Sequence, residues 1–151
     1  MESEIQAAVA SLTKADTRRL YADLGAYSRA YAADPTVFAS PSARVSIDAE
    51  VAGPLDDAIQ LGERILRHWN KVLFDLVCGT KEADPEARKV IMSALRLNSP
   101  EAMAAAVTGI LISVFSVGPA IAAVVGVLFG KVLMPAAGED LCSFWGERVR
   151  R

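Results

Sequence analysis

The sequence predicts an all-α protein, a bundle of about six helices in which a hydrophobic helical hairpin at about residues 100–134 is sheathed by amphipathic helices. Three observations predict it. Residues 102–130 contain no ionisable side chain. Five prolines stand where helices would begin, and the segments between them carry apolar residues at helical spacing. Because 151 residues suit one domain, we expect residues 1–151 to form a single all-α domain.

The first predicted helix covers about residues 3–33, with Leu20, Leu24 and Tyr27 on its apolar face. Two readings stay open: one continuous helix, or a break near residues 11–13 with Thr13 capping the second half. The following residues 34–53 contain two prolines and many small side chains, which predicts an irregular loop. Within it, either residues 46–52 form a helical turn or residues 37–47 pair locally.

Three further amphipathic helices are predicted at about residues 54–78, 85–97 and 135–149. The second of these follows Asp84-Pro85, and the hairpin follows Ser99-Pro100, each a capping side chain followed by a proline at the first helical position. Proline fits there because its missing N–H would have no partner inside the helix. The capping pairs therefore predict where these helices begin.

The central apolar run divides at Gly118 and Pro119, which predicts a hairpin turn: the glycine ends one helix and the proline begins the next. Small residues recur about every fourth position on one face of each arm: Ala105, Gly109 and Ser113 in the first arm, and Ala122, Gly126 and Gly130 in the second. Small side chains let helix backbones approach closely. We therefore expect these two small faces to meet, with the bulky faces turned outward.

Each arm of the hairpin is short for a membrane span. At 1.5 Å per residue an arm is about 24 Å long, whereas the hydrocarbon layer is about 30 Å thick. The amphipathic helices offer enough apolar surface to cover the hairpin in water. This plan, a hydrophobic hairpin inside a shell of amphipathic helices, resembles pore-forming colicin domains and the Bcl-2 group. The resemblance covers the hairpin and its sheath and carries no functional residues, because the Asn-Trp-Gly-Arg element of Bcl-2 proteins does not occur here.

No pattern of catalytic or ligand-binding residues emerges. The single histidine, His68, has Arg64 and Val72 as helical neighbours rather than a carboxylate or a metal ligand. Asp56 and Asp57 are adjacent on a helix and diverge, so they favour a role at the positive end of the helix dipole. We expect no catalytic residue, no metal site, no cofactor and no small-molecule substrate.

The net charge and the cysteines limit which functions and cellular locations we expect. The net charge of −2 and the dispersed basic residues give no footprint for nucleic acid. The acidic start, Met-Glu-Ser-Glu, does not resemble a signal peptide, and Cys78 and Cys142 lie far apart. We therefore expect a cytoplasmic protein with two reduced thiols, or alternatively a membrane-associated one. Abundant alanine and arginine favour a GC-rich bacterial source.

Two functions from different classes remain. The first is a non-enzymatic helical protein that acts through protein–protein interaction or self-assembly, with the hairpin as its buried core. Its contacts would come from the helix at 54–78 and the loop at 34–53, and its partner would be another protein or a second copy. The alternative is a membrane-inserting or pore-forming effector whose hairpin, residues 102–134, enters the bilayer constitutively or on a trigger.

Overall fold

The computed structural model describes residues 2–41, 45, 47, 49–79, 84–132 and 140–150, with the backbone alone at residues 2, 49 and 150. Over these residues the protein is all-α, as predicted, with eight α-helices, one 3₁₀ turn and no strand. The elements are α1 (Glu2–Leu12), α2 (Thr17–Ala33), η1 (Pro35–Phe38), α3 (Ala49–Ala52), α4 (Leu55–Cys78), α5 (Pro85–Arg96), α6 (Pro100–Phe115), α7 (Pro119–Val132) and α8 (Leu141–Arg150). The predicted start of the last helix at Pro135 and the end of the hairpin at 133–134 lie outside the described residues.

The helix starts follow the capping pairs in the sequence. The side-chain oxygens of Asp84 and Ser99 accept hydrogen bonds from backbone N–H groups of the next helical turn, at 2.9 Å and 3.3 Å. These bonds satisfy donors that have no partner inside the helix. The predicted starts of α5, α6 and α7 are confirmed: they begin at Pro85, Pro100 and Pro119.

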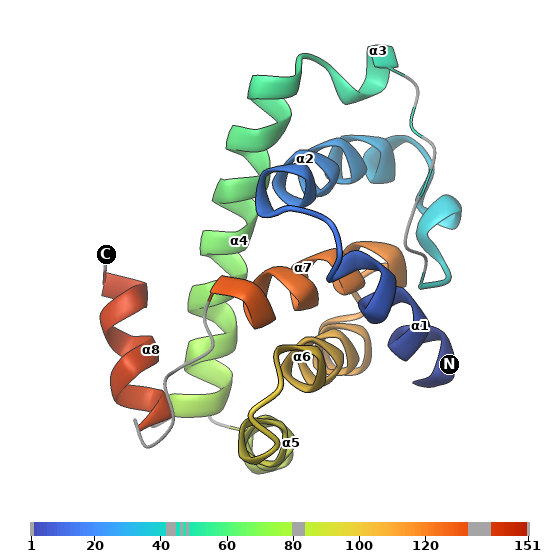
Figure 1. The fold of residues 1–151 in the computed structure, drawn as a ribbon. Helices are drawn as coiled ribbons and strands as arrows, with labels where there is room; N and C mark the ends of the chain where they lie inside the picture. Colours follow the sequence, from blue (N-terminus) through green and yellow to red (C-terminus); the bar gives the residue numbers. More distant parts are fainter. Residues whose placement is uncertain are drawn as a thin grey trace.

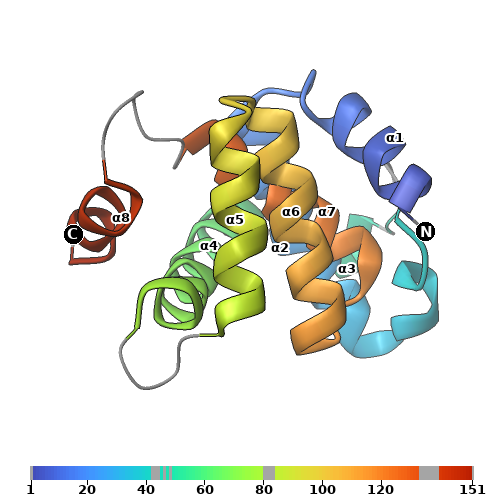
Figure 2. The same ribbon diagram turned by 90° about the horizontal axis from the view of Figure 1, so that it is seen from below.

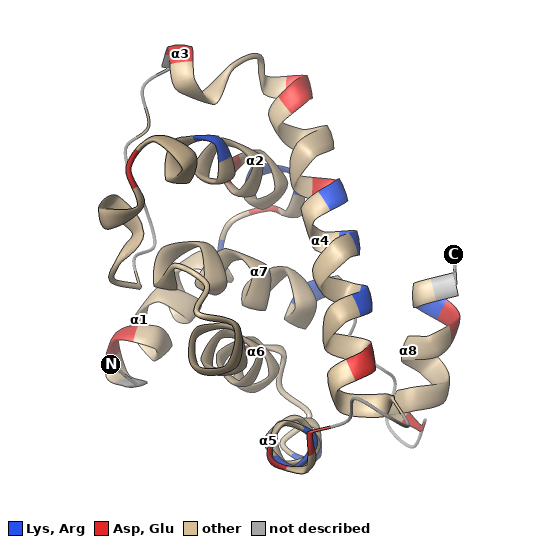
Figure 3. Ribbon diagram, turned by 180° about the vertical axis from the view of Figure 1, so that it is seen from behind, with Lys and Arg blue, Asp and Glu red and all other residues tan. Residues whose placement is uncertain are grey.

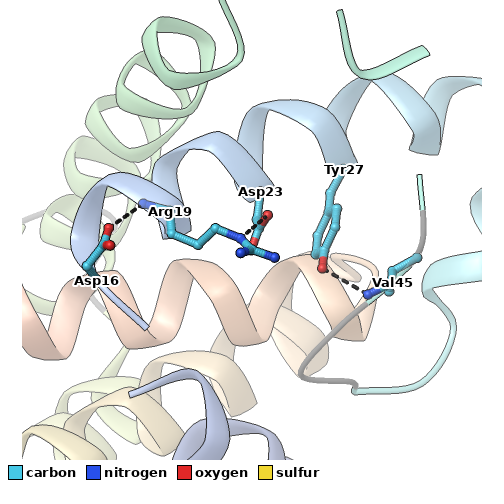
Figure 4. Close-up of polar contacts among 5 residues, drawn as sticks. All are labelled: Asp16, Arg19, Asp23, Tyr27 and Val45. Atoms are coloured by element: carbon cyan, nitrogen blue, oxygen red, sulfur yellow. Dashed lines mark hydrogen bonds and ion pairs between the residues drawn. The ribbon is translucent and has the colours of Figure 1, made fainter. Parts of the chain in front are cut away.

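The long N-terminal segment is broken into α1 and α2, but its cap is Asp16 rather than Thr13. Asp16 accepts a hydrogen bond from the backbone N–H of Arg19 at 2.8 Å (Figure 4). The Thr13 hydroxyl instead donates back to the Val9 carbonyl at 2.7 Å. Threonine is bonded within the last turn of α1 and cannot also cap α2. The aspartate three residues later takes that role.

Hydrogen bonds between described residues attach the loop at 34–53 to α2. The Tyr27 hydroxyl accepts a hydrogen bond from the backbone N–H of Val45 at 2.9 Å (Figure 4). The Arg29 guanidinium donates to the carbonyl of Ala52, the last residue of α3, at 2.8 Å. The loop contains the turn η1 and the short helix α3, so the alternative with a helical turn is the one found over its described residues.

Helix α7 is the centre of the fold (Figure 1). Every residue from Ala120 to Gly130 is buried. It lies between α2 on one side and α6 on the other, and α1 packs against it as well. A helix that is apolar all round needs cover on all sides, and these neighbours provide it. Helix α6 differs, because part of its surface is exposed, including Ser113 and Val114.

The hairpin turn forms at the predicted place, but its glycine has another role than expected. Helix α6 ends at Phe115, and the left-handed residue that caps it is Ser116, at φ 54°. Gly118 does not adopt a positive φ over this turn. A β-carbon at Gly118 would lie 3.0 Å from the Tyr31 ring, tighter than ordinary packing. The glycine therefore lets α2 and η1 approach the turn, while Pro119 begins α7 as predicted.

Helices α2 and α4 cross at two glycines. A β-carbon on Gly25 would collide with the backbone of Ala58, and one on Gly62 would collide with the backbone of Tyr21. Each helix thus contributes one glycine against the other helix's main chain. This close crossing fixes α4 against the half of the molecule that holds α2 and α7.

The expectation of two reduced thiols is wrong. Cys78, the last residue of α4, and Cys142, in the first turn of α8, form a disulfide with a Cα–Cα distance of 5.6 Å. The two cysteines are 64 positions apart and the whole hairpin lies between them, so their separation in sequence hid their proximity. The bond attaches α8 to the end of α4.

Buried aromatic contacts hold α8 against the core. Trp145 packs edge-on against Phe74 of α4 and Phe129 of α7, with ring centroids 5.7 Å and 6.0 Å apart. Its indole N–H donates to the side-chain oxygen of Asn70 on α4. Leu141, in the first turn of α8, is also buried in the core, so the disulfide, Trp145 and Leu141 attach this helix to the rest of the fold.

Candidate functional site

The two halves of the predicted small face lie in different places. On α7, a β-carbon at Gly126 would run into the Ala104 carbonyl and the Thr108 hydroxyl, and one at Gly130 would run into the Pro100 carbonyl. Ala122 is buried close by, and its carbonyl accepts a hydrogen bond from the Thr108 hydroxyl at 3.4 Å. The small residues of α7 therefore do allow close contact with α6.

On α6, however, the predicted residues are not the ones in that contact. A β-carbon at Gly109 would meet nothing within 4 Å. Ser113 is exposed and donates its hydroxyl to the Gly109 carbonyl at 2.8 Å. Ala105 is half-buried. The row that meets α7 is the adjacent one, with Ala104 and Thr108.

The error has a physical cause. Three successive alanines, residues 104–106, put small side chains on more than one face of α6. Adjacent residues of a helix are about 100° apart, so a shift of one residue turns the small row away from α7. Thr108 favours the inner position because its hydroxyl is satisfied by the Ala104 carbonyl at 2.7 Å. Periodicity alone could not choose between the two rows.

The displaced small row lines an open groove. Figure 2 shows α6 from this side, between α5 and α1. The groove has a volume of about 390 Å³, and its lining is mostly apolar. It is lined by Ile5, Gln6, Val90, Ala105, Ala106, Gly109, Ile110 and Ser113. We call this surface, with its walls α1 and α5 and its floor α6, the α6 groove.

An exposed apolar side chain belongs to the same surface. Val90 of α5 is 44% exposed and lines the groove. A valine at this exposure beside a floor of small residues adds apolar surface that water solvates poorly.

The two helices beside the groove differ in charge. The charged residues of α1 in the sequence are two acids, Glu2 and Glu4. Helix α5 carries three bases, Arg88, Lys89 and Arg96, against one acid, Glu86 (Figure 3). Glu4 and Lys89 are both exposed. The residues that line the groove are themselves uncharged, so these charges lie outside its lining.

The candidate catalytic or metal-binding residues of the sequence do not line this groove, and the histidine lies apart from the two aspartates. His68 is exposed on α4, and its ring stacks edge-on against Trp69 at 5.3 Å. Asp56 and Asp57 are exposed in the first turn of α4, and Asp56 lies 3.6 Å from the Arg18 guanidinium. In the part of the chain that the structure describes, no three His, Cys, Asp or Glu side chains are grouped as metal ligands would be.

Similarity to known proteins does not identify the function of this site. No family model, no curated protein and no solved structure significantly matches this chain.

Proposed function

We propose that this chain is a non-enzymatic protein that works through protein–protein contact, and that the α6 groove is where it pairs with a second copy of itself. The observation that carries the proposal is the position of Gly109, whose missing side chain faces open space on the exposed side of α6. A helix floor of small residues lets another helix backbone approach closely. Amphipathic helices in apolar grooves are a recurrent mode of protein recognition.

A second copy fits the different charges of α1 and α5. A two-fold axis running along α6 places the acidic α1 of each copy over the basic α5 of the other. Both contacts are repeated by symmetry, as in most homodimers. Opposite charges at the edge of an interface favour one orientation over others. The same operation brings the two rows of small residues at Ala105, Gly109 and Ser113 face to face.

The Cys78–Cys142 disulfide bears on where the protein works. Disulfides persist in oxidising compartments and are rare in the reducing cytosol. The bond supports a site of action in an oxidising environment, in place of the cytoplasmic location expected from the sequence.

The pairing is tested by filling the groove. Gly109→Arg places a long charged side chain over the α6 floor, whereas Gly109→Ala adds one methyl group in open space. In sedimentation velocity we expect wild type and Gly109→Ala to form concentration-dependent dimers, and Gly109→Arg to dissociate at least tenfold more readily, about 1.4 kcal/mol. Circular dichroism should show unchanged helicity in both variants.

Charge-reversal variants test the orientation of the two copies. Glu4→Lys and Lys89→Glu should each weaken the dimer by placing like charges together, and the double variant should recover part of the loss. A wild-type protein that stays monomeric at all concentrations, or a Gly109→Arg variant that dimerises as well as wild type, contradicts the pairing.

Membrane insertion is the second candidate, and the burial of α7 favours it. The hairpin arms carry no charge between Ala102 and Gly130, and α7 is sheathed on all sides. Among the described residues, no helix has both the length and the apolar character needed to cross a membrane. Insertion would therefore require the hairpin to leave its cover, and α8 with Trp145 is part of that cover.

Leakage of dye-loaded anionic liposomes tests this candidate. The protein should be compared at neutral and mildly acidic pH, with the Cys78–Cys142 bond intact and after reduction. Leakage that appears only when α8 is released supports insertion of the hairpin. Intact liposomes under all four conditions contradict it.

A further inference from the structure

A second concavity lies on the opposite part of the molecule, where α2, α4, α7 and α8 meet. It has a volume of about 280 Å³ and is lined by polar side chains over an apolar base. The polar groups are Tyr21, Glu63, Arg67, Asn70 and Arg148, and the apolar ones are Leu66 and Val132. None of these residues belongs to the α6 groove.

Two guanidinium groups are available for a ligand in this pocket. Arg67 makes no hydrogen bond or ion pair with any residue that the structure describes. Arg148 lies over the Phe144 ring, 5.0 Å from its centroid, a contact that leaves the guanidinium N–H groups free to donate. Arginine forks match the geometry of carboxylates and phosphates.

Glu63 could have paired with Arg67 and does not. The two residues are four apart on α4, the spacing at which a glutamate and an arginine commonly form an ion pair. No such pair is present among the described side chains, and both residues line the pocket. The pocket therefore presents a hydrogen-bond acceptor beside its cationic groups.

Neutral donors complete the lining. The side-chain oxygen of Asn70 is occupied by the Trp145 indole N–H, so the amide that remains for a ligand is the N–H₂ donor. Tyr21 is half-buried, and burial together with the nearby Glu63 carboxylate raises the pKa of its phenol above the ordinary value of 10.0. The phenol is therefore protonated at neutral pH and can donate a hydrogen bond.

We propose that this pocket binds a small organic anion, whose carboxylate or phosphate group is held by Arg67 and Arg148 and whose hydrocarbon part rests on Leu66 and Val132. Asn70 and Tyr21 supply further donors to the anionic group. Glu63 accepts from a hydroxyl or ammonium group of the same molecule. The volume lies near the lower end for ligand pockets, which limits the ligand to the size of a small metabolite.

The disulfide couples this site to the redox state. Arg148 comes from α8, and α8 is attached to α4 by the Cys78–Cys142 bond. Reduction frees one attachment of α8 and leaves Trp145 and Leu141 as its contacts with the core. Anion binding should consequently weaken after reduction.

Calorimetric titration with two probes, inorganic phosphate and butanoate, tests the site. Saturable binding of at least one probe is expected, and the tighter probe identifies which anionic group the pocket prefers. Arg67→Ala and Arg148→Ala should each weaken binding by about tenfold, as expected for the loss of a charge-assisted hydrogen bond. Arg67→Lys keeps the charge without the planar fork and should fall between wild type and Arg67→Ala.

Arg64→Ala is the matched control, because Arg64 is an exposed arginine of the same helix that does not line the pocket. It should bind both probes as wild type does. The proposal is overturned if neither probe binds saturably, or if Arg64→Ala weakens binding as much as Arg67→Ala does. Circular dichroism of each variant, with helicity equal to wild type, assigns any loss to the pocket.

Discussion

Replacing both Cys78 and Cys142 with serine is expected to lower the free energy of unfolding by about 4 kcal/mol. The bond closes a loop of 64 residues, and a crosslink over a loop of this length removes about that much conformational entropy from the unfolded chain in the loop-entropy model. The loss is large against the total stability of a single domain, about 5–15 kcal/mol. Chemical denaturation followed by circular dichroism measures it.

Reductant supplies the control for this experiment. Reduced wild-type protein should unfold at the same denaturant concentration as the double serine variant, and the variant should not respond to reductant at all. If oxidised and reduced wild-type protein unfold together, the bond contributes nothing to stability and the apolar contacts of Trp145 and Leu141 hold α8.

The second large expected effect is that alanine substitutions at different glycines change the free energy of unfolding in opposite directions. Gly62→Ala and Gly126→Ala should each lower the free energy of unfolding by about 1–3 kcal/mol, because the new methyl group meets backbone that cannot move away. Gly109→Ala should raise it by about 0.5–1 kcal/mol, because alanine favours the helix and the space beside Gly109 is open.

Denaturant titration of the three variants in parallel gives this contrast directly. The opposite signs are the informative result, since helix propensity alone would make all three substitutions stabilising. A stabilised Gly126→Ala would show that α6 and α7 are not in the close contact described here. A destabilised Gly109→Ala would show that the α6 floor is covered within the monomer.

Local signals allowed much of the fold to be predicted. The pairs Asp84-Pro85 and Ser99-Pro100 combine a capping side chain with a preset φ, so they locate helix starts without knowledge of the rest of the chain. The apolar run between Ala102 and Gly130 identified the core in the same way, although only α7 is enclosed on every side.

The features that could not be predicted depend on tertiary position. The disulfide requires Cys78 and Cys142 to meet after the hairpin has folded between them. The orientation of α6 depends on whether Ala104 or Ala105 faces α7, and these residues are identical. The α6 groove was missed for that reason: Ala105, Gly109 and Ser113, which line it, were assigned to the contact between α6 and α7.

The anion pocket was missed for a related reason. Its polar groups come from three helices that are distant in sequence, and each group taken alone is typical of a solvated helix face. An i,i+4 spacing of glutamate and arginine, such as that of Glu63 and Arg67, is typical of an ion pair on a helix surface. That Glu63 and Arg67 line a pocket becomes apparent only when Arg148 of α8 is placed beside them.

The central functional claim is that the α6 groove is filled by the same surface of a second copy. Filtered nuclear Overhauser spectra of a mixture of isotope-labelled and unlabelled chains test it most directly, because they record contacts between copies alone. We expect contacts between copies from Gly109 and Ala105 of α6, and from Glu4 of α1 to Lys89 of α5. A spectrum of the concentrated protein without contacts between copies at Gly109 and Ala105 would contradict the claim.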